Sequence, residues 1–211
     1  MNILIDRLRQ NDFPILFRFE NLFNIGLNKE DVNVLLNEAI KYKWIDNIYE
    51  DIYTLGYKYR KAFVPEGILA QMIDPQSYVS FLYILSDYGW IPEAVYNIIS
   101  VTDNKDMIVW TKKNGGFKYR KLYNNIPLAG IYVEDYGIES YKKATPLRAL
   151  CDYVYLFNCN WDKIDYLEDH LRIKMDSLEE LKAGDFDELQ DVFKIPNVEN
   201  FLVGIRKELG L

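Results

Sequence analysis

The sequence predicts an α+β fold in two parts: a small N-terminal unit of helices and a hairpin, then a mixed α/β domain with a mainly antiparallel sheet and C-terminal helices. Three observations support this prediction. Apolar residues recur at helical spacing near the N-terminus, short β-rich runs follow in the middle, and the chain is acidic and helical in pattern from about residue 161. With 49% hydrophobic residues in 211, the chain can bury a sizeable core.

The clearest N-terminal element is a helix over residues 28–42, with Asn28 as its N-cap. Upstream, a shorter helix around residues 19–23 is closed by Gly26, and β-rich runs over 43–55 predict a hairpin. The order helix, turn, helix, hairpin is that of a winged helix-turn-helix, which we place at residues 1–60. Apolar side chains mark one face of the longer helix: Val32, Leu35, Leu36, Ala39 and Ile40.

Residues 61–76 are expected to form a connector that contains a short apolar helix. The second domain, residues 77–211, is expected to begin with an apolar helix that ends near Gly89. The runs AVYNIISVT, MIVWT, FKYRKLY, AGIYVED and ESYKKA then predict five short strands. Thr145 and Pro146 are the N-cap and first residue of a predicted helix to about Phe157, before the acidic helical tail from about 161.

The formal net charge is −7, which argues against a strongly electrostatic nucleic-acid binder. Residues 1–61, however, hold equal numbers of basic and acidic residues, so the remainder carries the whole excess. No apolar run is long enough for a membrane span, and the N-terminus does not resemble a signal peptide. We therefore expect a cytoplasmic protein, with Cys151 and Cys159 as free thiols.

The predicted helix over 28–42 carries a polar stripe of Lys29, Asn33, Asn37 and Lys41, each four residues apart. Asn can pair with adenine edges, and Lys can reach phosphates or guanine, so the stripe predicts contacts in the major groove of DNA. Glu30 and Glu38 share the exposed side and would repel phosphate. The alternative interpretation is a solvated helix face on a unit that binds protein.

Beside the stripe, the predicted hairpin offers Tyr49, and Lys58, Arg60 and Lys61 follow it as the densest basic cluster of the N-terminal unit. Residues at such positions contact phosphates and fix the position of a protein on DNA without specifying sequence. An ordinary basic linker is the alternative interpretation of the cluster.

Catalytic chemistry finds little support in the sequence. The single histidine, His170, lies among acidic residues, and neither a Ser-His-Asp order, a zinc-binding motif nor a phosphate loop is present. We expect no enzyme activity, no metal and no cofactor. The FKYRKLY run interleaves basic and aromatic residues, which suits RNA or single strands, but we favour an ordinary half-buried strand. Arg148 and Asp152, four residues apart, are expected to pair and anchor their helix to the sheet.

Four stretches in order resemble the AbiEi family of abortive-infection antitoxins: SYVSFLYILSDYGWIPEAVYNIISVT, GGFKYRKL, GIYVED and YKKATPLRALCDYVYL. The resemblance spans roughly residues 1–160. It covers the Phe-x-Tyr-Arg strand and the Ala-Thr-Pro helix of the family, where Arg148 replaces the usual Lys. The residues of this sequence that carry it are Tyr119, Arg120, Thr145, Pro146, Arg148 and Asp152.

The resemblance implies a type IV toxin–antitoxin role in phage defence. Proteins of this family repress their own operon through the winged helix, and their second domain counters a nucleotidyltransferase toxin without a stable complex. Two copies would be needed to cover two half-sites of operator DNA.

Two alternatives remain at this stage. In one, the chain is a protein-interaction module whose acidic tail masks a basic surface of a nucleotidyltransferase-type toxin, without DNA binding. In a weaker alternative, the chain is an enzyme that reverses the toxin's modification of RNA.

Overall fold

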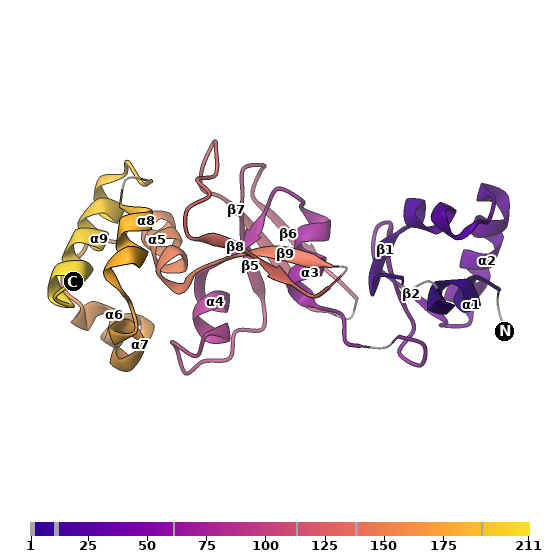
Figure 1. Ribbon diagram of the computed structural model, residues 1–211, viewed down its shortest axis with the longest axis horizontal. Helices are drawn as coiled ribbons and strands as arrows, with labels where there is room; N and C mark the ends of the chain where they lie inside the picture. The colour runs from indigo at the N-terminus through magenta and orange to yellow at the C-terminus, as the bar shows by residue number, and fades with distance from the viewer. Residues whose placement is uncertain (1–2, 11–12, 61, 113, 138, 191) are drawn as a thin grey trace.

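The computed structural model describes residues 3–10, 13–60, 62–112, 114–137, 139–190 and 192–211. The molecule is elongated. The N-terminal unit lies at one end, a large sheet lies in the middle, and the C-terminal helices lie at the other end (Figure 1). The N- and C-termini are therefore far apart.

The N-terminal unit combines helices with a small antiparallel sheet of strand order β1-β3-β2. A small core of its own holds these elements together, with Leu4, Phe17, Leu22 and Val32 among its buried side chains. Its elements are α1 (Ile3–Gln10), β1 (Leu16–Arg18), the 3-10 helix η1 (Phe19–Ile25), α2 (Lys29–Lys41), β2 (Ile45–Tyr49) and β3 (Ile52–Leu55).

The helix predicted over 28–42 is confirmed as α2. The Asn28 side chain caps it by accepting a hydrogen bond from the Asp31 backbone N–H at 2.8 Å, and Val32, Leu36 and Ala39 are buried as predicted. Both strands of the predicted hairpin are present as β2 and β3. Upstream, Gly26 has the left-handed conformation that ends a helix, but η1 is a 3-10 helix, and α1 and β1 were not predicted.

The larger part of the chain surrounds a mixed sheet. Within the described ranges its strand order is β6-β7-β5-β4-β9-β8. The pairs β5–β7 and β4–β9 are parallel and the other neighbours are antiparallel, so the sheet is less uniform than the mainly antiparallel sheet predicted. The strands are β4 (Tyr78–Val79), β5 (Ile98–Thr102), β6 (Met107–Trp110), β7 (Gly116–Lys121), β8 (Ile131–Asp135) and β9 (Ser140–Ala144).

Strand β4 departs from the sequence prediction, which assigned its residues to an apolar helix. Tyr78 and Val79 instead insert between β5 and β9, and the helix α4 (Phe81–Asp87) begins two residues later. The continuous apolar run is compatible with either structure, because a strand that is buried on both faces shows no alternation. The five predicted strands are confirmed as β5 to β9.

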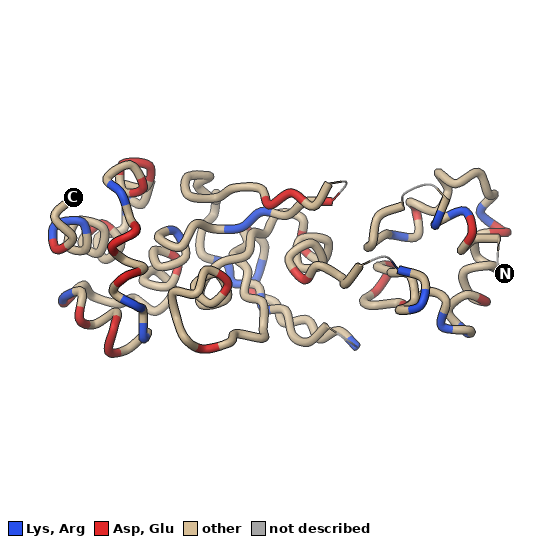
Figure 2. The backbone as a smooth tube through the Cα atoms, turned by 60° about the horizontal axis from the view of Figure 1, so that its bottom comes forward, with Lys and Arg blue, Asp and Glu red and all other residues tan. Residues whose placement is uncertain are grey.

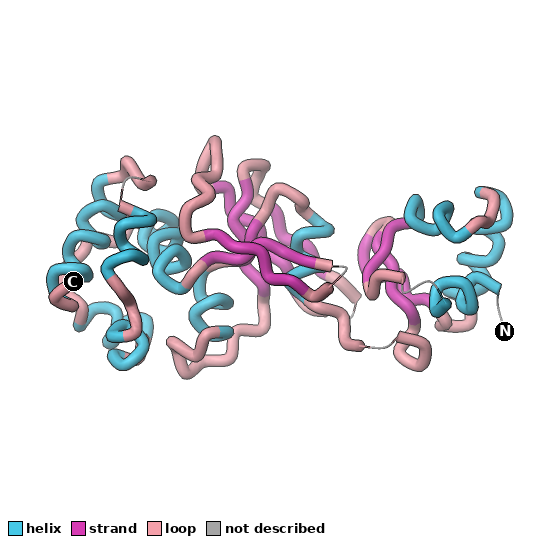
Figure 3. The backbone as a smooth tube through the Cα atoms, in the orientation of Figure 1, coloured by secondary structure: helices cyan, strands magenta, loops and turns pink. Residues whose placement is uncertain are grey.

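Helices pack against the sheet, and a group of helices forms the end of the molecule that lies away from the N-terminal unit (Figure 3). The short apolar helix predicted in the connector is α3 (Glu66–Ile73), which packs on β9 with Ile68 and Leu69 buried. The predicted Thr-Pro helix is confirmed as α5 (Pro146–Phe157). The remaining helices are α6 (Asp165–Leu171), α7 (Met175–Glu179), α8 (Ala183–Leu189) and α9 (Pro196–Glu208).

The acidic tail is helical, as predicted, and it is integrated into the fold. Val198, Phe201, Leu202 and Ile205 of α9 are buried in the large core, and α9 packs on α5. Asp and Glu positions recur along these helices (Figure 2). None of the helices in the described part of the chain combines the length and apolar character of a membrane span.

Gly67 and Gly184 both occupy the second position of a helix, α3 and α8 respectively. A Cβ on Gly67 would lie 2.3 Å from the buried ring of Tyr141, whereas one on Gly184 meets no described heavy atom within 4 Å. We expect Gly67→Ala to lower the free energy of unfolding by about 1–3 kcal/mol, because the core must shift to admit the methyl group. Gly184→Ala is the matched control and should be neutral or stabilising by up to about 1 kcal/mol. Urea denaturation measures both, and equal stabilities would contradict the close packing of α3 on β9.

Candidate functional site

The polar stripe predicted on the helix over 28–42 is exposed on α2. Lys29, Asn33, Asn37 and Lys41 are all accessible to solvent and lie beside the face of the helix that is buried in the small core. Helix α2 lies at the end of the molecule, with the sheet β1–β3 between it and the larger part of the chain (Figure 1). The stripe is thus exposed on a helix at the end of the molecule, where a large ligand can approach it.

Acidic residues border this stripe. Glu30 and Glu38 are exposed, and Asp31 is held by the Asn28 side-chain amide at 2.7 Å. The carboxylates Glu30 and Asp31 lie in the first turn of α2, where the helix dipole stabilises them. They weaken the attraction of the helix for phosphate, so binding through this face depends on contacts of the Asn and Lys side chains more than on net charge.

Tyr49, which was predicted to contact DNA from the hairpin, lies on the side of the hairpin that faces the larger part of the chain. The hairpin β2–β3 faces the larger part of the chain: Ile48 and Ile52 belong to the large core, and half-buried Tyr49 packs against it. The pKa of Tyr49 is raised by burial and by the neighbouring Glu50. The hairpin thus contributes to docking of the N-terminal unit.

Polar contacts reinforce this docking. The Leu16 backbone N–H donates to Glu139 at 2.9 Å, and the Arg18 guanidinium contacts both Asp51 and the Met72 carbonyl. Arg18 and Met72 belong to different parts of the molecule, so these bonds link the small sheet to α3.

The basic cluster after the hairpin is near the C-terminal end of α2. Lys58 is exposed, and together with residues 42–44 it lines a single cleft. Arg60 is half-buried, with its guanidinium 5.6 Å from the centre of the Tyr57 ring. Lys61, also predicted to contact phosphate, lies outside the described residues. The structure therefore brings Lys58 close to the α2 stripe, and separates Tyr49 from it.

The residues Tyr119 and Arg120 of the FKYRKLY run have different environments. Tyr119 is 1% exposed and donates a hydrogen bond to the Ala70 carbonyl at 2.8 Å, which ties β7 to α3. Arg120 is exposed and pairs with Asp106 at 2.7 Å. The pKa of Asp106 is lowered by the Lys121 backbone N–H and by Arg120. The favoured interpretation of a half-buried strand is confirmed at these positions.

Thr145 and Pro146 begin α5 as predicted, and the Thr145 hydroxyl accepts a hydrogen bond from the Arg148 backbone N–H at 3.3 Å. One turn later, Arg148 and Asp152 form the predicted pair, with 3.0 Å between Nε and Oδ1 and both side chains 0% exposed. The other guanidinium nitrogens of Arg148 donate to the carbonyls of Pro127 and Ala129 and to the Tyr78 hydroxyl.

Asp152 is surrounded by donors. It accepts hydrogen bonds from Tyr78 and Ser80 at 2.7 Å and from Tyr123 at 2.8 Å. Burial and the nearby Asp152 raise the pKa of both tyrosines, so they remain neutral donors. Burial alone would lower the pKa of Arg148, but Asp152 reverses this effect and keeps the guanidinium charged. The pair is closed to solvent, and its bonds to Tyr78 anchor α5 to the sheet, as predicted.

A second buried cation was not predicted. Lys143 on β9 is 6% exposed and lies between Asp87 and Glu134, at 3.2 and 3.0 Å. Its ammonium also lies over the rings of Tyr88 and Tyr132. The lysine is surrounded by partners, and it joins α4 to β8. In the sequence, the burial of Lys143 could have been indicated only by the alternation of the strand, which places this residue on the inward side.

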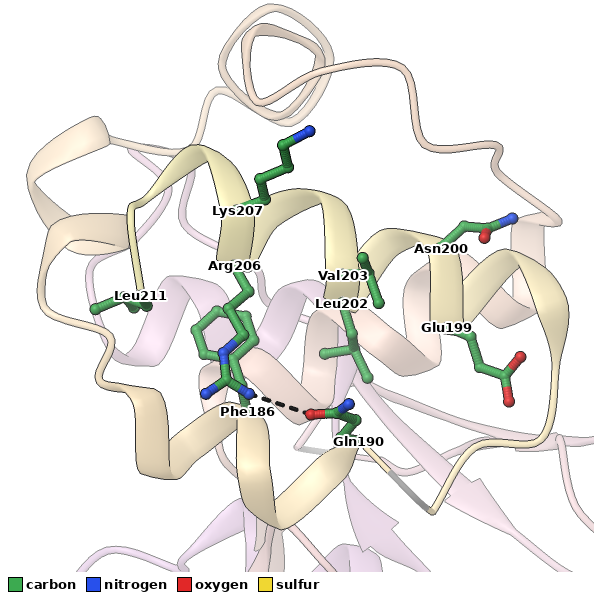
Figure 4. Close-up of a pocket in the computed structure, with 9 residues that line it drawn as sticks. All are labelled: Phe186, Gln190, Glu199, Asn200, Leu202, Val203, Arg206, Lys207 and Leu211. Atoms are coloured by element: carbon green, nitrogen blue, oxygen red, sulfur yellow. Dashed lines mark hydrogen bonds between the residues drawn. The ribbon is translucent and has the colours of Figure 1, made fainter.

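A cleft between α8 and α9 has a volume of about 810 Å³ (Figure 4). Phe186 and Leu202 form its apolar part, and Arg206 extends along Phe186 to contact Gln190 at 3.1 Å and Asp187 at 2.8 Å. The Lys207 side chain points away from Phe186 in Figure 4. The guanidinium of Arg206 is thus held by partners from α8 and the residue that follows it.

Comparisons with protein-family models and with curated proteins give no match for this chain. Among the described residues, no three His, Cys, Asp or Glu side chains are grouped so that they could hold a metal ion. The exposed face of α2, with Lys58 at its C-terminal end, is therefore the arrangement that best suits a binding function, and we take it as a candidate nucleic-acid interface.

Removing one partner of the Arg148–Asp152 pair is expected to cost more stability than breaking an exposed ion pair. Asp152→Ala leaves a buried guanidinium without its counter-charge, so we expect a loss of about 3–5 kcal/mol in the free energy of unfolding. Arg120→Ala, which breaks the exposed Arg120–Asp106 pair, is the control and should cost at most about 1 kcal/mol. Chemical denaturation of both variants gives the comparison. A cost for Asp152→Ala no larger than that of the control would contradict its anchoring role.

Tyr119 predicts a loss of stability at alkaline pH. Burial raises the pKa of its hydroxyl above the ordinary value of 10.0. Above that pH the unfolded chain releases a proton that the folded chain keeps. The contribution of the Tyr119 hydroxyl to the free energy of unfolding is therefore complete below pH 10. It declines as the pH rises further, by up to about 1.4 kcal/mol per pH unit.

We expect Tyr119→Phe to cost about 1 kcal/mol at neutral pH, through the lost bond to Ala70, and to show a shallower decline above pH 10. The control is Tyr96→Phe, because Tyr96 is 83% exposed and its loss should leave the parent's pH dependence unchanged. Urea titrations at about pH 9 and about pH 11 measure the difference. If the free energy of unfolding falls equally between the two pH values in the parent and in Tyr119→Phe, the Tyr119 hydroxyl is not the group that causes the decline.

Proposed function

We propose that this protein is a cytoplasmic DNA-binding autorepressor, and that it serves as the antitoxin of a type IV toxin–antitoxin system. Its N-terminal unit would act as a winged helix-turn-helix, with η1 and α2 as the two helices and α2 as the recognition helix. The observation that carries the proposal is the exposed stripe of Lys29, Asn33, Asn37 and Lys41 on the outer side of α2.

The chemistry of the stripe supports sequence-selective contacts. Asn33 and Asn37 can each present an amide oxygen and an amide nitrogen to the adenine edge, and Lys29 and Lys41 can reach phosphates or guanine at the two ends of the helix. Lys58 and Arg60 would contact the DNA backbone near the C-terminal end of α2. Tyr49 packs against the large core, so the proposal assigns the backbone contacts to Lys58 and Arg60 and not to Tyr49.

The antitoxin role rests on the resemblance to AbiEi proteins over four stretches of the second domain. In this proposal the partner in function is a nucleotidyltransferase toxin, no stable complex with it is required, and the chain itself carries out no catalysis. Two copies would bind the half-sites of an inverted repeat in operator DNA. Co-expression with a toxin encoded beside it tests this part: restored growth supports the antitoxin role, and unrelieved toxicity contradicts it.

DNA binding is tested by fluorescence anisotropy with the chain's own upstream DNA and a scrambled duplex, at about 50 and 200 mM salt. We expect Asn33→Ala combined with Asn37→Ala to weaken operator binding by at least about tenfold, because each lost pairing removes base-specific contacts. The matched control is Asn124→Ala combined with Asn125→Ala, two exposed asparagines of the second domain. Unchanged operator affinity in the α2 variant, or equal affinity for both duplexes, would refute the recognition role of this helix.

A further inference from the structure

The cleft at the C-terminal end of α2 is lined by two segments, residues 42–44 with Asp46 and residues 57–59. The Gly56 backbone N–H donates to the Trp44 carbonyl at 2.7 Å, which joins the segments. A Cβ on Gly56 would lie only 2.3 Å from the Lys43 carbonyl oxygen, so glycine is required for this close approach. Lys43 itself has a positive φ of 57°, which turns the chain sharply from α2 into β2. The cleft has a volume of about 380 Å³.

Aromatic rings dominate the surface of this cleft. The rings of Tyr42 and Trp44 are stacked with centroids 5.0 Å apart. Tyr42 is 54% exposed and Tyr57 is 74% exposed. Beyond Tyr57, a second shallow cleft continues past Arg60 to Phe63, which is also exposed. Exposed rings thus follow one another along this edge of the N-terminal unit.

Positive charges alternate with these rings. Lys43 and Lys58 line the cleft, and the only acidic residue that the described part of its lining contains is Asp46. The Lys41 ammonium lies 5.7 Å from the centre of the Tyr42 ring, and Arg60 lies over Tyr57. In a chain of net charge −7, such a group of basic residues favours a polyanion.

We propose that this cleft binds unpaired nucleotides of a single-stranded nucleic acid. Exposed rings offer stacking faces to bases, and bases present free faces only where they are unpaired, since those of a duplex are stacked on one another. Tyr57 and the Tyr42–Trp44 stack would hold bases, and Lys43, Lys58 and Arg60 would contact the backbone phosphates. Either DNA or RNA has this chemistry. The stacking rings of this cleft are distinct from the Asn33–Asn37 face, and Lys58 and Arg60 are shared with the duplex contacts of the proposed function.

The test uses the full chain and fluorescein-labelled oligomers of about 12 nucleotides, oligo-dT and oligo-U, within the usual site size for such proteins. We expect binding that weakens with salt and falls by about 5- to 150-fold in Tyr57→Ala, the range for loss of one stacked base. Tyr96→Ala is the matched control, because Tyr96 is 83% exposed and remote in sequence from the cleft. Lys58→Gln should weaken binding, and Lys105→Gln, on an exposed loop, should not.

Binding of oligo-U, of oligo-dT and of the operator duplex answers different questions. A preference for oligo-U identifies RNA as the ligand, and a preference for oligo-dT identifies DNA. Operator binding that survives Tyr57→Ala, with oligomer binding that survives the Asn33/Asn37 double substitution, establishes that the stacking rings and the Asn33–Asn37 face recognise different ligands. Absence of oligomer binding by the parent, or equal binding by parent and Tyr57→Ala, overturns the proposal. Binding of poly-glutamate with the same dependence on Tyr57 also overturns it, because the cleft would then be a site for acidic protein.

Discussion

The buried pair of Arg148 and Asp152 is the interaction on which the larger part of the molecule depends. Isolating either charge from water would cost several kcal/mol, so each must be matched by partners inside the protein. These partners come from β4, from the segment before β8 and from the segment after β7. The Phe193 ring, from the C-terminal region, lies against the guanidinium. A single ion pair thereby fixes how α5 sits on the sheet and how the C-terminal helices cover it.

This arrangement also determines what the N-terminal unit can present. The sheet that α5 anchors supports α3, and the hairpin β2–β3 docks beside α3 through Ile48, Ile52 and the Arg18 contacts. With the hairpin occupied in this way, the unit is left with its outer surface, which includes α2 and the cleft at its C-terminal end. A polar side chain on α2 is therefore available for recognition because the opposite side of the same unit is used for packing.

Helices with a cap and a clear apolar stripe could be predicted from the sequence, as α2 and α5 show, because local hydrogen bonds and spacing determine them. Strand β4 could not, since its two residues owe their conformation to neighbours far along the chain. For the same reason the stripe on α2 was predictable as an exposed face, whereas the position of Tyr49 was not. Its environment depends on docking between two parts of the molecule, which leaves no local signal.

The runs of alternating aromatic and basic residues show that a sequence pattern alone does not determine whether the rings are exposed. FKYRKLY drew attention as a single-strand binding pattern, yet its Phe117 and Tyr119 are buried, since β7 lies within the sheet. The shorter runs KYKW at 41–44 and YKYR at 57–60 carry the same alternation, and they lie where α2 ends and where β3 ends. At such ends no neighbouring strand or helix covers every ring, so Tyr42 and Tyr57 remain exposed. Alternation of aromatic and basic residues thus does not by itself indicate a stacking site, because the position of the run at the end of an element decides whether its rings are available to a ligand.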